Sequence, residues 1–443
     1  MRRSSLQAVG MLMTNGSLPR ANATPSDSRT LAAAFERVRA DSERICAPLE
    51  IEDYGIQTMA DVSPPKWHLA HTSWFFETFL LKPYLGGYRE FHPLYAHLFN
   101  SYYETAGTYH PRPERGLLAR PTVEQVYAYR AHIDEHMLRL LTQSEAGDAQ
   151  AVAYRATLGM HHEQQHQELL LTDIKHIFAY NPLRPAYMPE ALPVSVDASD
   201  PPLHFIGVEG GVKQIGSEGA GFAYDNETPC HRVYVDDFRL GSRLITNGEY
   251  RAFIEDGGYS QPQWWLSDAW KTVQVQQWQA PLYWEPRDGE WWQMTLRGMS
   301  RVDDDAPVCH VSYYEADAFA RWAGKRLPTE AEWEIVAAQL PVTGNLRERG
   351  ALAPQRAQNE QRWQQIYGDV WEWTQSPYAG YPGYRPLEGT LGEYNGKFMS
   401  SQMVLRGGSC VTPPDHIRAT YRNFFYPGDR WQFSGIRLAE DGL

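Results

Sequence analysis

The sequence has little of what marks secreted or membrane proteins. Only four cysteines occur among 443 residues, and no two form a C-x-x-C pair. A disulfide framework and a cysteine zinc site are therefore not expected. No stretch approaches the roughly 18 consecutive apolar residues of a membrane span, because the most apolar one, WFFETFLLKPYL, is interrupted by Glu77 and Lys82.

Positive charge is also in deficit. The 54 acidic residues outnumber the 41 basic ones, which gives a net charge of −13. Nucleic acid or an anionic membrane as a partner would need a basic face, so neither is expected. Residues 1–28 are rich in Ser, Asn and Gly and lack an apolar core of signal length. We interpret them as a flexible tail of a cytoplasmic protein.

The first half, residues 29–182, reads as helical. Ser26 or Asp27 can cap a first helix, and Ser63 before a proline opens a second. Thr122 and Gln125 form the capping box of a third helix, and a fourth runs to the end of this half. Four amphipathic helices predict a bundle. The connection over residues 84–121 is not expected to be helical, and connections of that length are often functional.

The second half has a different character. Residues 183–203 are proline-rich and are interpreted as a linker to a domain over residues 204–443. That domain has short β-prone runs: HRVYVDDFRL, APVCHVSYY, MVLRGGS and FSGIRLAE. Only EADAFARWAGK and TEAEWEIVAAQ look helical. The whole chain is therefore expected to be α+β, with much irregular backbone in its second half.

The run HHEQQHQE predicts a metal site. His162 and His166 are four residues apart, so they lie on one face of a helix and can chelate one ion. A divalent ion usually needs a third protein ligand. The second helix offers His68 and His71, which are three apart and share a face. Spacing alone does not choose between them.

Two kinds of metal chemistry fit this run. Read as H-E-x-x-H, it makes Glu163 the base of a zinc protease. However, a linker follows this helix, and the β-rich part comes after it, whereas the substrate-aligning sheet of such proteases usually precedes it. Three neutral imidazoles suit iron as well as zinc, and iron with vacant positions would let a thiol and O₂ bind together.

Longer motifs then give a resemblance. LAHTSWFFE and HEQQH resemble the DinB-type four-helix bundle of the ergothioneine-biosynthetic sulfoxide synthases (EgtB family). The second half resembles the domain fused to it, which is related to formylglycine-generating enzymes (FGE) and C-type lectins. The matching motifs there are PVCHVSYYEADAFARWAGKRLPTEAEWE, YGDVWEWTQSPY, VLRGGSC and RNFFYPGDRWQFSGIRLAE.

The resemblance implies an oxygenase. Non-haem Fe(II) would be held by His71, His162 and His166, with His71 in the family's L-A-H position and His68 beside the ligands. The family joins a cysteine sulfur to C2 of the imidazole of hercynine, using O₂, and leaves the sulfur as a sulfoxide. The implied partners are therefore small molecules.

The resemblance also assigns substrate contacts. Arg112 and Arg115 are suited to the carboxylate of the thiol substrate, because guanidinium pairs with carboxylate through two hydrogen bonds. Gln165 matches the residue that hydrogen-bonds the imidazole. The segment that lines the hercynine pocket, whose trimethylammonium group favours aromatic faces, is matched by Asn423, Phe424 and Phe425.

A pair of tyrosines bears on the choice of thiol. Members that use free cysteine carry such a pair, which implies that Tyr102 supplies a proton or electron and that Tyr103 supports it. Members that use γ-glutamylcysteine have an acidic residue at the position of Phe425 and take their catalytic tyrosine from the second domain. Free cysteine is therefore the expected thiol, and Tyr394 is the less favoured catalytic tyrosine.

Four alternatives stay open. The thiol could be γ-glutamylcysteine, or the enzyme could be an ovothiol-type synthase acting on histidine. The zinc protease is the weakest alternative. The non-enzymatic alternative is a metal-bearing scaffold whose second domain binds a partner. A copper site like that of formylglycine-generating enzymes is not expected, because VLRGGSC is followed by no second cysteine.

Overall fold

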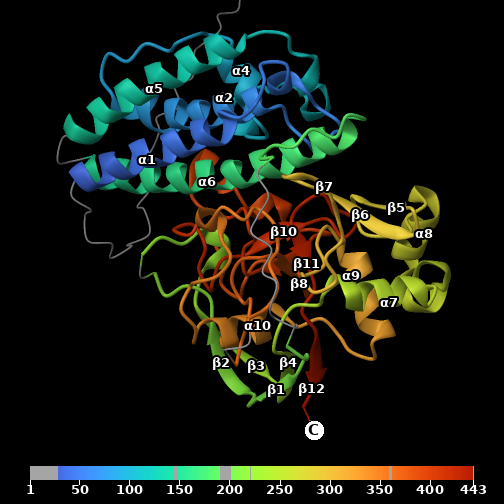
Figure 1. The fold of residues 1–443 in the computed structure, drawn as a ribbon. Helices are drawn as coiled ribbons and strands as arrows, with labels where there is room; N and C mark the ends of the chain where they lie inside the picture. The colour runs from blue at the N-terminus through green and yellow to red at the C-terminus, as the bar shows by residue number, and fades with distance from the viewer. Residues whose placement is uncertain (1–27, 144–147, 190–200, 220, 359–361, 443) are drawn as a thin grey trace, which may run out of the picture.

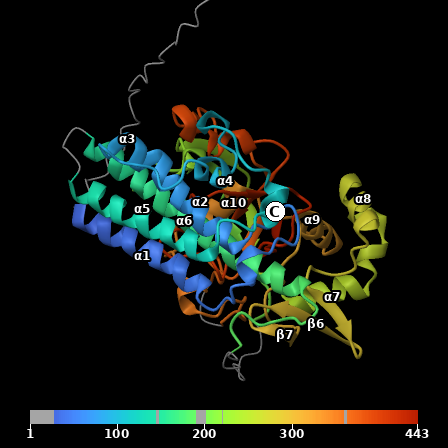
Figure 2. The ribbon, with the colours of Figure 1, turned by 90° about the horizontal axis from the view of Figure 1, so that it is seen from above.

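The first half of the chain folds as a bundle of four long helices. The computed structural model describes residues 28–143, 148–189, 201–219, 221–358 and 362–442. The bundle helices are α1 (Ser28–Cys46), α2 (Pro65–Phe76), α5 (Val123–Gln143) and α6 (Ala149–Tyr180). Figures 1 and 2 show them as one layer stacked on the second half, with α6 on the side that faces it. The predicted bundle is confirmed.

Helix α2 is the most enclosed of the four. Pro64 precedes its first turn, and all of its residues are buried. It packs against α5 and α6 and continues through the π-helical turn η2 (Glu77–Leu81) into α3 (Lys82–Tyr84). The capping box of α5 forms as predicted, since Thr122 and Gln125 exchange hydrogen bonds of 2.9 and 3.2 Å. The suggested caps of α1, Ser26 and Asp27, lie outside the described residues, as does nearly all of the tail.

The prediction of a connection without helix after α3 was wrong. It contains the helix α4 (Tyr95–Phe99) and two 3-10 turns, η3 (Glu104–Ala106) and η4 (Arg112–Leu117). Tyr95 and Phe99 are four residues apart and are both buried, and their rings pack against the ring of Tyr129 on α5. Packing of two aromatic side chains thus stabilises a helix too short to be read from its pattern.

The described residues of the second half form four small sheets. Their strand orders are β1-β4-β12, β2-β3, β5-β6-β7 and β10-β9-β8-β11. The strands are β1 (Phe205–Val208), β2 (Gly211–Ile215), β3 (His231–Val235), β4 (Phe238–Gly241), β5 (Trp284–Arg287), β6 (Glu290–Thr295), β7 (Gly298–Arg301), β8 (Trp371–Pro377), β9 (Met403–Arg406), β10 (Asn423–Phe425), β11 (Ser434–Gly435) and β12 (Ala439–Asp441). Figure 1 shows β1 to β4 and β12 at the end farthest from the bundle and β10 near it. The chain is α+β, as expected.

The two predicted helices of this half are confirmed as α9 (Tyr313–Trp322) and α10 (Glu330–Ala337). The prediction that they are the only ones was wrong, because α7 (Asn247–Glu255) and α8 (Ser267–Gln276) also form. Helix α7 starts with a capping box between Thr246 and Glu249.

The run APVCHVSYY does not form the expected strand. His310 in its middle has φ of 63°, in the left-handed region, which ends an extended backbone. The flanking amides bond to separate segments, Val308 N to Ile245 O at 2.9 Å and Val311 N to Ser434 O at 3.5 Å. The run therefore crosses between elements as a loop.

Helix α6 joins the two halves through a buried carboxylate. Glu168 accepts hydrogen bonds from Trp371 Nε1 at 2.6 Å, Ser409 Oγ at 2.8 Å and Thr412 Oγ1 at 2.8 Å. A buried carboxylate is stable only when its oxygens are satisfied in this way. This contact fixes α6, the helix with two of the candidate ligands, against the second half. No helix among the described residues is long and apolar enough to cross a membrane.

Candidate metal centre

Three histidines meet in the bundle. His71 comes from α2, and His162 and His166 come from successive turns of α6. One nitrogen of each lies within 4.8 Å of the others, and His71 Nε2 is 3.2 Å from His162 Nε2. They are the only group of three or more possible ligands that meets this test in the described part of the chain. The structure thus brings together the three residues that the resemblance implies.

The chemistry of the three rings fits a divalent metal ion. His71 Nδ1 lies 2.6 Å from the carbonyl oxygen of Phe99, so the ring donates there and turns the lone pair of Nε2 toward His162. Burial lowers the pKa of His162 to about 3 and that of His71 and His166 well below the usual value. The rings are therefore neutral, which is the form that binds metal.

A second row of side chains orients His166. His68 Nδ1 lies 2.8 Å from His166 Nδ1, and His68 Nε2 lies 2.9 Å from Asp173 Oδ2. The same carboxylate oxygen accepts the backbone N–H of Ser63 at 2.8 Å. This chain leaves His166 Nε2 for the centre, as outer hydrogen bonds do in metal sites. His68 thus lies behind the triad rather than in it.

Glu163 does not face the histidines as a free base. It is fully buried and is held by Arg39 at 2.9 Å, Arg130 at 3.0 Å and Ser42 at 2.7 Å. Burial opposes its charge, but the two arginines outweigh that effect, so the pKa of Glu163 lies below its usual value. The protease alternative therefore loses its catalytic base.

The two predicted arginines differ in their surroundings. Arg115 is buried, donates to Ser63 Oγ at 2.9 Å, and has its guanidinium carbon 3.3 Å from the ring centre of Trp67. Trp67 stacks in turn on His71 at 4.6 Å. Among the described residues no carboxylate lies within ion-pair distance of Arg115. Arg112 is half-exposed and reaches Asp61, with Nη1 3.7 Å from Oδ1.

Three tyrosines lie on one side of the centre. The rings of Tyr102 and Tyr103 stack at 4.6 Å, and Tyr103 also packs on Trp74, which stacks on His71. Tyr394 follows the 3-10 turn η9 (Gly389–Glu393), and its ring lies 5.7 Å from that of His162. Sequence analysis made Tyr394 the least favoured catalytic tyrosine. Its ring nevertheless makes the closest contact of the three with a candidate metal ligand, His162.

The predicted hercynine segment is β10. Asn423, Phe424 and Phe425 are half-buried, and Phe424 stacks on Tyr378 at 4.0 Å. Phe398 bridges from Phe424 to Tyr102, with ring distances of 5.9 and 5.0 Å.

Gln165 on α6 lies between two tyrosines of the second half. It accepts from the hydroxyl of Tyr394 and donates to the hydroxyl of Tyr421 at 2.6 Å. Sequence reasoning missed Tyr421, Asp173 and His416. Their only signal was position, since Asp173 lies seven residues, about two helical turns, beyond His166 on α6, and Tyr421 is two residues before β10.

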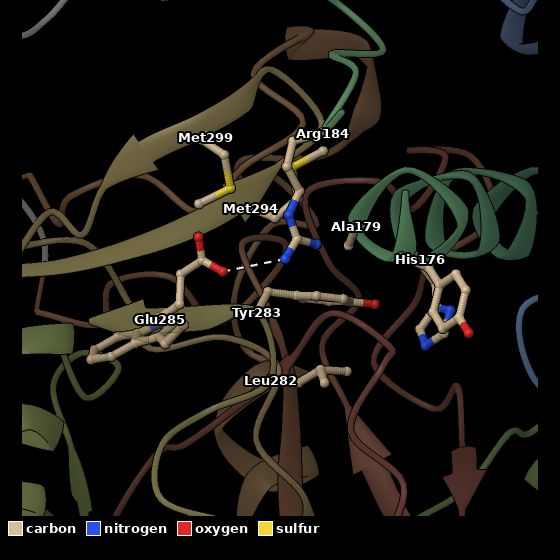
Figure 3. A pocket seen from close by; sticks show the side chains of 10 residues that line it. His176, Ala179, Arg184, Leu282, Tyr283, Glu285, Met294 and Met299 are labelled. Carbon is tan, nitrogen blue, oxygen red and sulfur yellow. Dashed lines mark hydrogen bonds and ion pairs between the residues drawn. The ribbon is translucent and has the colours of Figure 1, made fainter. Parts of the chain in front are cut away.

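A separate cavity of about 290 Å³ lies at the far end of α6 (Figure 3). It is bounded by α6 on one side and by β5 to β7 on the other. Its lining includes His176, Tyr283 and the ion pair between Arg184 and Glu285 at 3.2 Å. None of the three clustered histidines lines it, so it is distinct from the metal centre.

Both halves of the chain are similar to known protein families. Residues 34–170 match the DinB superfamily, and residues 193–367 and 353–442 match the sulfatase-modifying factor enzyme 1-like domain. A hercynine oxygenase of Mycolicibacterium smegmatis is 31% identical over 90% of this chain and 96% of its own. The hercynine oxygenase of Mycolicibacterium thermoresistibile is 34% identical (86% and 88% coverage), and that of Mycobacterium tuberculosis is 32% identical (93% and 98%).

Proposed function

Because the chain belongs to the hercynine oxygenase family, the O₂-dependent sulfoxide synthases of ergothioneine biosynthesis, we propose that it joins cysteine to C2 of hercynine at Fe(II). The ion would be held by His71, His162 and His166. The observation that carries this proposal is the convergence of three neutral imidazoles within 4.8 Å of one another. Bound iron would supply positions at which a thiol and O₂ meet.

Arg115 is the proposed partner of the cysteine carboxylate. Among the described residues no carboxylate lies within ion-pair distance of this buried guanidinium, and Asp173 attracts it only from farther away; burial lowers the pKa of Arg115 well below the usual value. An uncompensated buried cation is costly, so an anionic ligand is stabilised there. Its stacking on Trp67, which itself stacks on His71, places that charge next to the metal centre. Arg112, which is half-exposed and paired with Asp61, would help to bind the carboxylate from the solvent-exposed side of the site.

Tyr102 is the proposed proton donor, with Tyr103 behind it. Burial raises the pKa of both hydroxyls above the ordinary value for tyrosine. Both therefore carry their protons at neutral pH and can donate one to a developing negative charge. Tyr103 is enclosed by Trp74 and Phe79, so its ring gives Tyr102 a fixed surface to stack on.

Hercynine would lie between α6 and β10. Gln165 would hold its imidazole, and Asn423, Phe424 and Phe425 would line the side where the trimethylammonium group lies. Aromatic faces attract a quaternary ammonium ion through their π-electrons. Support comes from the aromatic series Phe424, Phe398 and Tyr102, which runs from β10 toward the centre.

Free cysteine is proposed over γ-glutamylcysteine because Phe425 offers no charge to a glutamyl amino group. The ring of Phe425 packs on Trp431 at 5.6 Å.

A reducing cytoplasm is the proposed location, and the four cysteines are all free thiols, three of them buried.

The test is an aerobic competition. The Fe(II)-loaded protein is mixed with hercynine and equal amounts of cysteine and γ-glutamylcysteine, and products are identified by mass spectrometry. Hercynylcysteine sulfoxide as the main product is the expected result. Mainly the glutamyl product would keep the family reaction and overturn the thiol assignment. No coupled product from iron-loaded protein would overturn the proposed function, and product from histidine in place of hercynine would indicate the ovothiol-type reaction.

A further inference from the structure

A chain of hydrogen bonds leaves α6 at Gln165 and returns to it at His161. Gln165 Nε2 donates to the hydroxyl of Tyr421 at 2.6 Å. That hydroxyl lies 3.1 Å from His416 Nε2, and His416 Nδ1 lies 3.0 Å from His161 Nδ1. Tyr421 and His416 are buried and come from the second half. Neither has a role in the function proposed above.

The chain has a direction. A hydroxyl has one proton, so when Tyr421 donates to His416 Nε2 its oxygen accepts from Gln165 Nε2. Burial lowers the pKa of His416 well below the usual value, so the ring is neutral. In the tautomer whose Nε2 accepts from Tyr421, the single N–H lies on Nδ1 and faces His161. The amide nitrogen of Gln165 is thereby held at Tyr421. Its carbonyl oxygen is held at the opposite side, where the hydroxyl of Tyr394 donates to it.

The carbonyl side is the side of the metal centre, because the ring of Tyr394 lies 5.7 Å from that of His162. A carbonyl oxygen has two lone pairs, so Oε1 can accept from a second donor besides Tyr394. A ligand placed there meets an acceptor rather than a donor. If the side-chain amide of Gln165 were rotated by half a turn, it would present its Nε2 donor instead. It would then favour a ring that offers a lone pair rather than an N–H.

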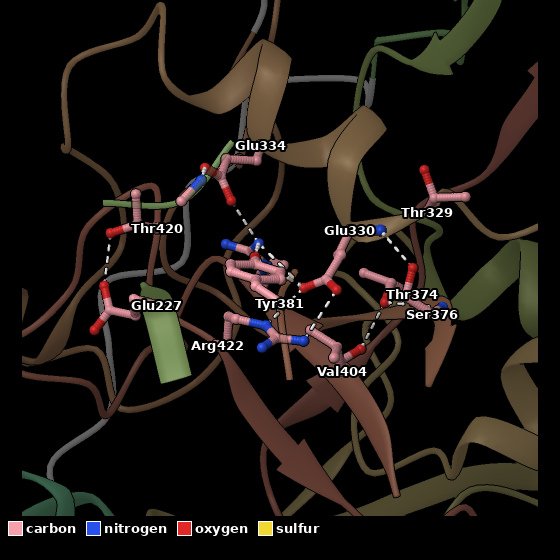
Figure 4. Close-up of polar contacts among 12 residues, drawn as sticks. Glu227, Thr329, Glu330, Glu334, Thr374, Ser376, Tyr381, Val404, Thr420 and Arg422 are labelled. Carbon is pink, nitrogen blue, oxygen red and sulfur yellow. Dashed lines mark hydrogen bonds and ion pairs between the residues drawn. The ribbon is translucent and has the colours of Figure 1, made fainter. Parts of the chain in front are cut away.

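The two chain neighbours of Tyr421, Thr420 and Arg422, each bond to a buried carboxylate (Figure 4). Thr420 Oγ1 donates to the buried Glu227 at 2.6 Å. Arg422 donates to both oxygens of Glu330 at 2.8 and 3.0 Å. The ring of Tyr421 also packs on Trp371 at 5.4 Å. These contacts restrict the movement of the Tyr421 ring, and such support is what a group that orients another residue requires.

We propose that Tyr421 and His416 are positioning residues that fix the polarity of the Gln165 amide, so that the site accepts an imidazole through a ring N–H. This inference rests on the proposed function and adds a specificity rule to it. Hercynine has such an N–H while its other ring nitrogen keeps a lone pair. The thiazole analogue of hercynine, in which sulfur replaces the N–H, lacks the donor and is rejected.

The first test is Tyr421→Phe, which removes the hydroxyl and keeps the ring. We expect the KM for hercynine to rise about tenfold, the effect of one buried hydrogen bond, with kcat, the KM for cysteine and iron content close to wild type. The preference for hercynine over the thiazole analogue, measured as the ratio of KM to the inhibition constant, falls by a similar factor. Tyr234→Phe, on an exposed side chain of β3, is the matched control.

The second test compares His416→Gln with His416→Leu. Glutamine keeps an acceptor for Tyr421, so we expect it to restore most of the hercynine preference, whereas leucine does not. Equal effects of the two changes would indicate a merely structural role and overturn the inference, as would unchanged preference in Tyr421→Phe. If wild-type protein neither binds nor converts hercynine, the proposed function itself fails. If the wild-type protein binds hercynine normally and the variants keep the wild-type preference for hercynine, this inference alone is overturned.

Discussion

The helical half presents its three metal-site histidines from two long helices, whereas the second half reaches the same region through loops and one short strand. His162 and His166 are placed by helical periodicity alone, and His71 by the packing of α2 against α6. Tyr394 and Tyr421 are placed by turns, buried ion pairs and contacts across the domain boundary. Under the proposed function, we infer that the bundle would bind the metal and that the loops of the second half would help to orient the substrate.

His162→Ala should have the largest effect. Two histidines remain, and a divalent site with two protein ligands holds its ion weakly. We expect both iron retention and sulfoxide formation to be lost, as measured by metal analysis of the purified variant and by product assay. His97→Ala, whose ring contacts Thr108 and His110, should retain iron. Iron content unchanged in His162→Ala would remove this residue from the ligand set.

The next largest effect tests which half supplies the catalytic proton. Tyr102→Phe should lower sulfoxide formation about 100-fold or more, the usual size of general acid catalysis, and divert turnover toward oxidation of the thiol alone. Tyr394→Phe, in the second half, should change the ratio of products far less. The measurement is the ratio of coupled sulfoxide to oxidised thiol. The opposite ranking would assign the role to Tyr394.

Asp173→Asn tests the support behind the triad. The carboxylate orients His68, which contacts His166, so its loss should weaken iron affinity by about 10- to 100-fold. Competition with a chelator measures that affinity. Asp317→Asn, in an i, i+4 ion pair with Arg321 on α9, should leave the iron affinity unchanged. An iron affinity equal to wild type in Asp173→Asn would show that the histidines orient themselves by packing.

Substitution of the two arginines should affect the KM for cysteine to different extents, because Arg115 is buried and Arg112 is half-exposed. Arg115→Leu removes a buried guanidinium and should raise the KM for cysteine by about 10- to 100-fold. Arg112→Leu removes a half-exposed pair with Asp61 and should raise it less than about fivefold. Steady-state kinetics with iron-saturated protein gives both values. Equal effects would mean that the cysteine carboxylate lies near the half-exposed Arg112 rather than beside Trp67.

The sequence predicted the features that depend on local periodicity. The i, i+4 pair on α6, the α5 capping box and the two helices of the second half follow from neighbours along the chain. Features set by distant contacts were missed or misread. The run around His310 is β-prone, but its amides bond to two separate segments. His416 and Tyr421 have no pattern of their own, because their roles depend on their approach to α6.

Iron K-edge X-ray absorption on the Fe(II)-loaded protein, before and after hercynine and cysteine are added, tests the central claim most directly. The account predicts three imidazole ligands in both states and a new sulfur scatterer when cysteine is present. In Arg115→Leu at the same cysteine concentration, the imidazole shell should stay and the sulfur contribution should fall. A coordination shell with fewer than three imidazoles, or one that never gains sulfur, would contradict the assignment of the metal to the bundle and of the thiol to that metal.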